Sequence, residues 1–236
     1  MFKLIQLNVE GDKHLDKILP FLKQENPDVI CLQEFSETAF NLFKTELSMD
    51  GILAPMSREE GIIFGAGILT KLPIKVSDYQ YYYKPGEELL GGKRHEDDLE
   101  WLAFALVRAD ILSGDDTFTV TTTHFPKNHI GREVSDFQKK LQVDLTKMLN
   151  SMPEIIFTGD TNCPRGTEIF DNWATIYKDN IPKEVVTSLD KNLHRAGYLP
   201  YMVDALFTTP HYEVVNIKLV DGVSDHLAVV ASIKKI

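Results

Sequence analysis

Short apolar runs alternate along the chain with segments in which apolar residues recur at helical spacing. Runs of about four to eight apolar or β-branched residues, bounded by glycine, proline or asparagine, are typical of buried strands. Stripes at every third or fourth position indicate helices that cover a sheet with one face. The pattern predicts strands at 2–8, 28–33, 61–70, 76–83, 99–111, 116–124, 153–157, 202–208, 212–220 and 227–234, and helices at 12–24, 36–47, 133–149 and just after Thr167.

Local signals refine three of these helices. Ser36 and Thr167 carry hydroxyls that can accept a bond from a free N–H of the first helical turn, so we expect them as N-caps. Pro20 lies inside the helix predicted at 12–24 and conflicts with it. Because proline removes a backbone donor and crowds the preceding turn, that helix should either kink or start late.

The composition indicates one large folded domain. Of the 236 residues, 43% are hydrophobic and 25% are charged, which suits a sizeable core and argues against disorder. The longest apolar runs are too short to span a bilayer. Residues 1–236 show no repeat, linker or low-complexity tract, so we expect a single domain, monomeric and without a membrane segment. Helices and strands are interleaved throughout, which is typical of an α/β fold.

The cysteines and the first residues bear on the compartment. Cys31 and Cys163 are too few for a disulfide framework. Cys31 lies in a strand pattern and should pack as a small apolar residue, and nothing around Cys163 predicts an activated thiol. Met1-Phe2-Lys3 leads directly into the first strand, so we expect no signal peptide and a cytoplasmic protein.

The charge balance limits the partners. Lys and Arg number 25 against 35 Asp and Glu, for a net charge of −10. This charge repels an extended polyanion on average and weighs against tight nonspecific binding of duplex DNA. A local basic patch is compatible with the total.

A carboxylate and an amide follow the strand predicted at 153–157, in the stretch Gly159-Asp160-Thr161-Asn162. Side chains two apart on extended backbone point the same way, so Asp160 and Asn162 should face one spot. A carboxylate can accept a proton from water, and an amide both donates and accepts hydrogen bonds. Taken alone, such a stretch is more often simply a turn.

Further polar residues at the ends of apolar strands change that interpretation. Asp204 lies within an apolar strand and needs a partner, for which His226 is the candidate. Strand ends that converge on one edge can gather polar groups without burying unpaired charge. In chain order the set is Asn8, Glu34, His124, Asp160, Asn162, Asp204, Asp225 and His226.

In this order the set resembles the motifs of the endonuclease/exonuclease/phosphatase superfamily, and the resemblance spans nearly the whole chain. Members include pancreatic deoxyribonuclease, abasic-site endonucleases, sphingomyelinases, inositol-polyphosphate 5-phosphatases and tyrosyl-DNA phosphodiesterase. The Gly-Asp-Thr-Asn form and the opening Asn8-Val9-Glu10-Gly11 are most similar to the last branch, in which aspartate is common where Glu10 stands. The resemblance implies a four-layer sandwich, with two packed mixed β-sheets flanked by helices.

The resemblance also implies a phosphoesterase that depends on Mg²⁺ or Mn²⁺. Glu34 would be the principal metal ligand, with Asn8 and Asp225 completing or supporting the site. Such oxygen ligands favour Mg²⁺ or Mn²⁺ over Zn²⁺.

The other residues of the set would carry the catalytic steps that the resemblance implies. Asp160 would deprotonate the attacking water, and Asn162 would position that water or a phosphoryl oxygen. His226, held by Asp204, would donate to a phosphoryl oxygen as negative charge builds. His124 would contact another phosphoryl oxygen.

The function itself stays open at several points. A Ser-His-Asp hydrolase would also use a His–Asp pair, but no Gly-x-Ser-x-Gly elbow occurs. A non-catalytic binding module is the other class, although no expected catalytic position is lost. We expect hydrolysis of a phosphodiester at a nucleic-acid end, an end adduct or a small phosphodiester. The alternatives are a general DNA endonuclease and a phosphomonoesterase of a lipid or sugar phosphate.

Loop residues near the site could hold a phosphate and a few bases. The tyrosine-rich segment 79–83 is first interpreted as an aromatic strand face and second as a stacking platform for bases. The basic loop residues are Lys93, Arg94, Lys127, Arg132, Arg165, Lys191 and Arg195.

Overall fold

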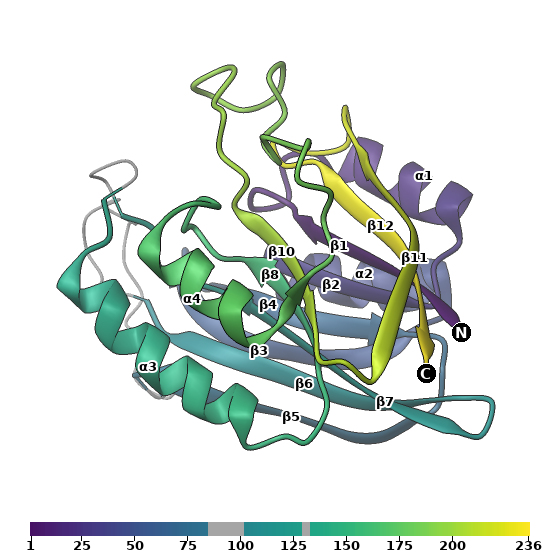
Figure 1. Cartoon of the computed structure of the whole chain (residues 1–236). Coiled ribbons are helices and arrows are strands. Elements are labelled where there is room, and N and C mark those ends of the chain that lie inside the picture. The colour runs from purple at the N-terminus through teal and green to yellow at the C-terminus, as the bar shows by residue number, and fades with distance from the viewer. Residues whose placement is uncertain (85–101, 129–132) are drawn as a thin grey trace.

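The computed structural model describes residues 1–84, 102–128 and 133–236; Lys93, Arg94 and Arg132 therefore lie outside the described residues. In the described ranges, the chain forms two six-stranded sheets and four helices (Figure 1). The elements are β1 (Phe2–Asn8), α1 (Leu15–Glu25), β2 (Val29–Ser36), α2 (Glu37–Leu47), β3 (Asp50–Glu59), β4 (Ile62–Thr70), β5 (Ile74–Tyr83), β6 (Phe104–Ser113), β7 (Asp116–His124), α3 (Asp136–Asn150), β8 (Ile156–Asp160), α4 (Glu168–Ile176), β9 (Lys178–Asp179), β10 (Asp204–Thr208), β11 (Tyr212–Val220) and β12 (Ala228–Lys235).

Both sheets are mixed. The first has the strand order β11-β12-β1-β2-β4-β3 and the second the order β5-β6-β7-β8-β10-β9. One central pair in each sheet is parallel, β1 with β2 and β7 with β8, and the other described pairs are antiparallel. Because parallel strands end at the same edge of a sheet, the polar residues that close these four strands lie at two shared edges.

The central strands alternate between two apolar layers. In β1, Leu4 belongs to the core between the sheets, whereas Ile5 and Leu7 pack with residues of α1 and α2. On the far side of the second sheet, Phe157 of β8 packs edge-on against Trp173 of α4, with ring centroids 5.7 Å apart. The layers therefore run helix, sheet, sheet, helix, which confirms the predicted four-layer sandwich.

Several predicted elements, α1, α3, β8 and β10 among them, begin later than their patterns indicated. Helix α1 starts at Leu15 instead of residue 12, but this start does not remove the conflict with proline, because Pro20 still lies inside the helix, with its ring exposed. Strand β8 starts at Ile156 because Pro153, which cannot donate to a strand ladder, lies in the turn after α3. Asp160 is consequently the last residue of the strand and does not follow it.

The edge strand β3 was not predicted. It lacks strict alternation and contains Pro55, which lies beside an irregularity in its pairing with β4. Proline is tolerated at such edges because no neighbouring strand needs its N–H.

The two predicted caps differ in outcome. Ser36 accepts a bond from the backbone N–H of Ala39, at 2.9 Å, and so caps α2 as expected. Thr167 precedes α4, but its side chain makes no cap hydrogen bond within the described part of the chain.

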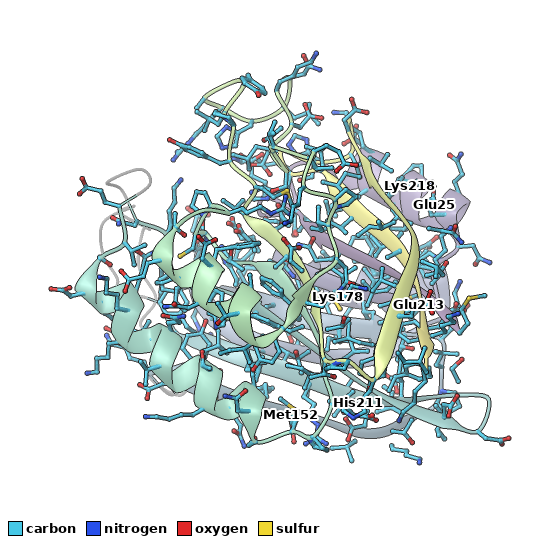
Figure 2. All side chains as sticks on the ribbon, viewed as in Figure 1. Glu25, Met152, Lys178, His211, Glu213 and Lys218 are labelled. Atoms are coloured by element: carbon cyan, nitrogen blue, oxygen red, sulfur yellow. The ribbon has the colours of Figure 1, made fainter. Side chains whose placement is uncertain are left out.

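The edge strand β11 is tied to α1 by an ion pair. Figure 2 shows Lys218 near Glu25, and the Lys218 Nζ lies 2.8 Å from Oε1 of Glu25.

Among the described helices, none has the length and hydropathy needed to cross a membrane.

Candidate active site

The predicted site residues converge at one end of the sandwich. Asn8 and Glu34 come from β1 and β2 of the first sheet, while His124 and Asp160 close β7 and β8 of the second. Two contacts join the sheets here, one between Asn8 and Asp160 and the other between Glu34 and His124. The polar residues thus meet where each sheet has one parallel pair, since such strands end together.

Glu34 reaches the site from an irregular position in β2. Its φ is +56°, and the pairing of β2 with β4 shifts register between Leu32 and Phe35. A left-handed residue at a bulge re-aims the side chain away from the regular alternation, and such strain often marks functional positions. The Glu34 side chain keeps 24% of its surface exposed, so it is accessible to an incoming ion.

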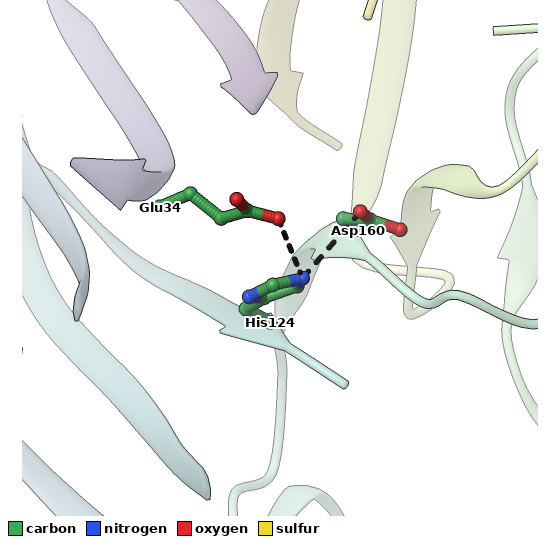
Figure 3. A group of neighbouring side chains, drawn as sticks. All are labelled: Glu34, His124 and Asp160. Atoms are coloured by element: carbon green, nitrogen blue, oxygen red, sulfur yellow. Dashed lines mark ion pairs between the residues drawn. The ribbon is translucent and has the colours of Figure 1, made fainter. Parts of the chain in front are cut away.

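Glu34, His124 and Asp160 form a cluster that could hold a metal ion (Figure 3). The Nε2 of His124 lies 3.4 Å from Oε1 of Glu34 and 3.6 Å from Oδ2 of Asp160. One donor atom from each residue lies within 4.8 Å of the other two. Two carboxylates and one imidazole are a plausible donor set for a divalent cation, so the residues present fit such an ion. The family resemblance implies a phosphate contact for His124 instead.

Asn8 separates the two carboxylates of this cluster. Its Nδ2 lies 3.1 Å from Oε1 of Glu34 and 3.0 Å from Oδ2 of Asp160. Its oxygen accepts from the backbone N–H of Glu10 at 3.0 Å. In this arrangement a nitrogen that cannot bind a metal faces the carboxylates, so Asn8 supports them, and ligation through its oxygen would require the amide to turn.

Asn162 reaches the same place as Asp160, but not through extended backbone. Its φ is +48°, and its backbone N–H donates to Oδ1 of Asp160 at 2.8 Å. Its Nδ2 donates to the carbonyl of Phe125 at 2.8 Å and lies 3.0 Å from Nε2 of His124. The prediction that both residues face one spot is right, whereas the reason is a turn that bonds to the Asp160 carboxylate.

Gly159 allows the approach of β7 and β8 just before Asp160. Its φ is +136°, and a Cβ there would overlap the backbone oxygen of Thr123. Only glycine fits both the dihedral and the close contact.

His226 and Asp204 form the predicted pair. The Nδ1 of His226 lies 2.8 Å from Oδ2 of Asp204, and both residues are buried. The Nε2 of His226 lies 3.7 Å from Oδ2 of Asp160, which links the pair to the cluster. Burial lowers the pKa of His226, but the charges of Asp204 and Asp160 outweigh it and hold that pKa well above its ordinary value.

Burial acts in the opposite direction on the acids. It raises the pKa of Asp160, although the charges of His226 and His124 oppose the shift. Burial also raises the pKa of Asp225 to about 6, with the charges of Glu10 and Glu34 adding to the effect. The charge of Glu34 therefore acts on Asp225, but Asp225, predicted as a metal ligand, is not a member of the metal-ligand cluster found in the described residues.

Two buried glutamines near the site, Gln6 and Gln33, are not among the predicted site residues. Gln6 and Gln33 lie in apolar strands, two residues before Asn8 and one before Glu34, and both have 0% exposure. A polar residue in an apolar strand needs a partner, which was the available signal. Gln6 contacts Asp204 directly, at 2.8 Å.

The guanidinium of Arg165 is bonded within the protein, whereas its position in a loop predicted that it would hold a phosphate of the substrate. Its guanidinium pairs with Asp179 at 2.8 Å and donates to the carbonyls of Ile181, Pro182 and Val185. These bonds give it a structural role. Lys127, Lys191 and Arg195 are exposed on loops.

The tyrosine-rich strand and Cys163 are mostly structural. The Tyr82 ring is buried and stacks on Phe104 and Phe125, and Tyr81 donates to the carbonyl of Pro55. The interpretation as an aromatic strand face is confirmed for these two residues.

Burial raises the pKa of the Cys163 thiol, which keeps it protonated and unreactive.

Most of the chain matches a known protein family. The sequence model of the Endonuclease/Exonuclease/phosphatase family matches residues 5–226. A search of curated proteins found no match.

Solved structures share the fold at low sequence identity. The Bacteroides thetaiotaomicron mannosyl-6-phosphatase has a TM-score of 0.73 and 14% identity, with 99% of this chain and 100% of that chain covered. The human Nocturnin catalytic domain with bound sulfate has a TM-score of 0.73 and 15% identity, with coverage of 100% and 93%. D. rerio TDP2 complexed with single strand DNA product has a TM-score of 0.68 and 16% identity, with coverage of 99% and 99%.

Proposed function

This chain belongs to the Endonuclease/Exonuclease/phosphatase family, and on that premise we propose that it is a phosphoesterase that uses a divalent metal ion. The observation that carries the proposal is the meeting of Glu34, His124 and Asp160 beside the His226–Asp204 pair. Phosphoester hydrolysis needs neutralised charge, an activated water and a donor to the phosphoryl oxygens. This end of the sandwich offers a group for each task.

Glu34 is proposed as the main ligand of the ion, with Mg²⁺ or Mn²⁺ as the expected metal. Its carboxylate is the most exposed of the cluster and is aimed there by the β2 bulge. Carboxylate oxygens are the ligands that these cations prefer. A bound cation would neutralise the phosphate charge and polarise its oxygens.

Asp160 is proposed as the proton acceptor for the attacking water. Donors from Asn162 and Asn8 hold its two oxygens, at 2.8 and 3.0 Å, so its orientation is fixed. Its raised pKa suits a group that must take up a proton during the reaction. The amide of Asn162 lies beside it and can position the water or a phosphoryl oxygen.

His226 is proposed as the donor to a phosphoryl oxygen. Asp204 accepts from its Nδ1, which leaves Nε2 facing the cluster. The charges of Asp204 and Asp160 raise the pKa of His226 and so favour the protonated ring, whose Nε2–H can donate as negative charge builds in the transition state. His124 can serve as a further phosphate contact or as a metal ligand through Nε2.

The proposed substrate has a short footprint, such as a nucleic-acid end, an end adduct or a small phosphodiester. The net charge of −10 disfavours a long polyanion, while exposed Lys127, Lys191 and Arg195 offer local positive charge. A phosphomonoester is the second candidate, favoured by the structural likeness to a mannosyl-6-phosphatase.

The test is metal-dependent release of nitrophenol from bis(nitrophenyl) phosphate, compared with mono-nitrophenyl phosphate. Turnover with Mg²⁺ or Mn²⁺ that is abolished by a chelator and by Glu34→Gln would support the proposal. No turnover of either ester with either metal, from a folded protein, would instead indicate a binding module.

A further inference from the structure

The layer between the two sheets changes from apolar to polar toward the active-site end. Residues of β1 that face this layer are Phe2 and Leu4 at one end and Gln6 and Asn8 at the other, and β2 and β7 follow the same order. Apolar residues would fill the polar positions at lower cost, because a buried amide loses its hydration. Gln6 in particular lies where a core residue would be expected.

A chain of hydrogen bonds runs through this polar part of the layer. The Nε2 of Gln6 donates to Oδ1 of Asp204 at 2.8 Å and to Oε1 of Gln33 at 2.9 Å. The Nε2 of Gln33 donates to Oγ1 of Thr122 at 2.9 Å. Since Oδ2 of Asp204 faces Nδ1 of His226 at 2.8 Å, Gln6 and His226 occupy the two oxygens of one buried carboxylate.

The two ends of the Gln6 amide differ in their hydrogen bonding, because only the nitrogen, which faces Asp204, has acceptors. Its Oε1 has no hydrogen-bond partner within the described residues, which is unfavourable for a side chain with 0% exposure. Its Nε2, by contrast, has two acceptors. Gln6 is also the side-chain donor to Oδ1 of Asp204 among the described residues, so a fully buried carboxylate would lose that partner without it.

We propose that Gln6 is a positioning residue for the His226–Asp204 pair. By donating to Oδ1, it fixes the plane of the Asp204 carboxylate so that Oδ2 meets Nδ1 of His226 and Nε2 faces the cluster. Gln33, anchored on Thr122, keeps the Gln6 amide from rotating. The inference rests on the proposed function for its catalytic consequence, and Gln6 itself touches no substrate.

The experiment compares Gln6→Met with the control Thr121→Val. Thr121 is buried on β7, but its hydroxyl donates to the carbonyl of Ile156 at 3.1 Å and takes no part in the chain from Thr122 to Asp204. Both changes keep the side-chain size nearly constant and remove one buried polar group, but only the first takes the donor from Asp204. In Gln6→Met, kcat should fall by at least about 10-fold, as expected for a partner that orients a functional side chain, while KM stays within about twofold. The low-field NMR signal of the His226 Nδ1–H should shift or broaden. Thr121→Val should lower the melting temperature but leave kcat and that signal close to wild type.

Equal losses of kcat in the two variants, or an unchanged His226 signal in Gln6→Met, would overturn the proposal. Should Gln6→Met not fold, hydrogen exchange in the wild-type protein decides, with the exposed Gln80 as reference. Side-chain amide protons of Gln6 that exchange as fast as those of Gln80 would disprove the bond, and slow exchange would support it. If no phosphoester is hydrolysed at all, the proposed function fails, while the NMR comparison still decides the role of Gln6.

Discussion

Asn8 and Asp160 are joined across the two sheets, since Nδ2 of Asn8 donates to Oδ2 of Asp160 at 3.0 Å although 152 positions separate them. The same nitrogen lies 3.1 Å from Oε1 of Glu34. A neutral donor thereby stands between two carboxylates that would otherwise repel each other. This single amide both bonds the two sheets to each other at the site and makes the close approach of the acids tolerable.

Replacing Asn8 by Asp should destabilise the protein in a pH-dependent way. The new carboxylate would be buried against Glu34 and Asp160, so its folded pKa would be raised and its ionised form penalised. The penalty is absent below about pH 4, the pKa of an unfolded aspartate, and grows as pH rises, to the order of 2 kcal/mol at neutral pH. Thermal unfolding at pH 4 and pH 7 measures it, with the exposed Asn41→Asp as control. A melting temperature equal to wild type at both pH values would contradict the arrangement.

Glu34→Gln should abolish metal-dependent activity while the fold is retained. The change keeps the shape of the side chain but removes the charge that would hold a cation. We expect kcat to fall on the order of 100-fold or more, as for the loss of a group that stabilises transition-state charge. Binding of Mn²⁺, followed by electron paramagnetic resonance, should weaken in parallel, whereas the exposed Glu46→Gln should change neither. Near-native turnover at low Mg²⁺ would show that the ligand assignment is wrong.

His226 and Asp204 should act as a unit. His226→Gln removes a donor that matters most in the transition state, so kcat should fall more than KM rises. Asp204→Asn should reduce kcat by the same route because the acceptor of the ring loses its negative charge. Steady-state kinetics of the single and double variants test this, and the double variant should lose much less than the product of the two single effects. Fully additive losses would mean that the residues work independently.

The length of substrate that the site accepts can be measured by comparing the rates at which the protein hydrolyses phosphoesters of different length and chemistry. Intact circular DNA, short single-stranded oligonucleotides with 5′ ends, 5′-phosphotyrosyl oligonucleotides and sugar phosphates are compared at equal salt. We expect ends, end adducts or small esters to be preferred, because the acidic chain repels a long duplex. Lys127→Ala should raise KM for oligonucleotides more than for bis(nitrophenyl) phosphate. Efficient nicking of the circle, with little action on ends or small esters, would favour a general endonuclease.

The residue pattern alone determined that helices and strands are interleaved, and it determined one contact of the site, whereas the four layers followed from the family resemblance. In the folded chain, the alternation in β1 separates Leu4, which faces the other sheet, from Ile5 and Leu7, which face helices. The pairing of Asp204 with His226 also followed from the sequence, because an acid in an apolar strand requires a partner.

Only the tertiary structure decided how the remaining groups meet. Glu34 and Asn162 adopt positive φ values, and no hydrophobic pattern predicts those dihedrals for residues other than glycine. His124 joins Glu34 because β7 and β2 come from different sheets whose packing sets their distance, and the bond from Gln6 to Asp204 depends on that same packing. Local patterns specify faces and strand ends, whereas the register between two sheets arises from all their side chains packing together, so contacts across that interface are properties of the folded chain.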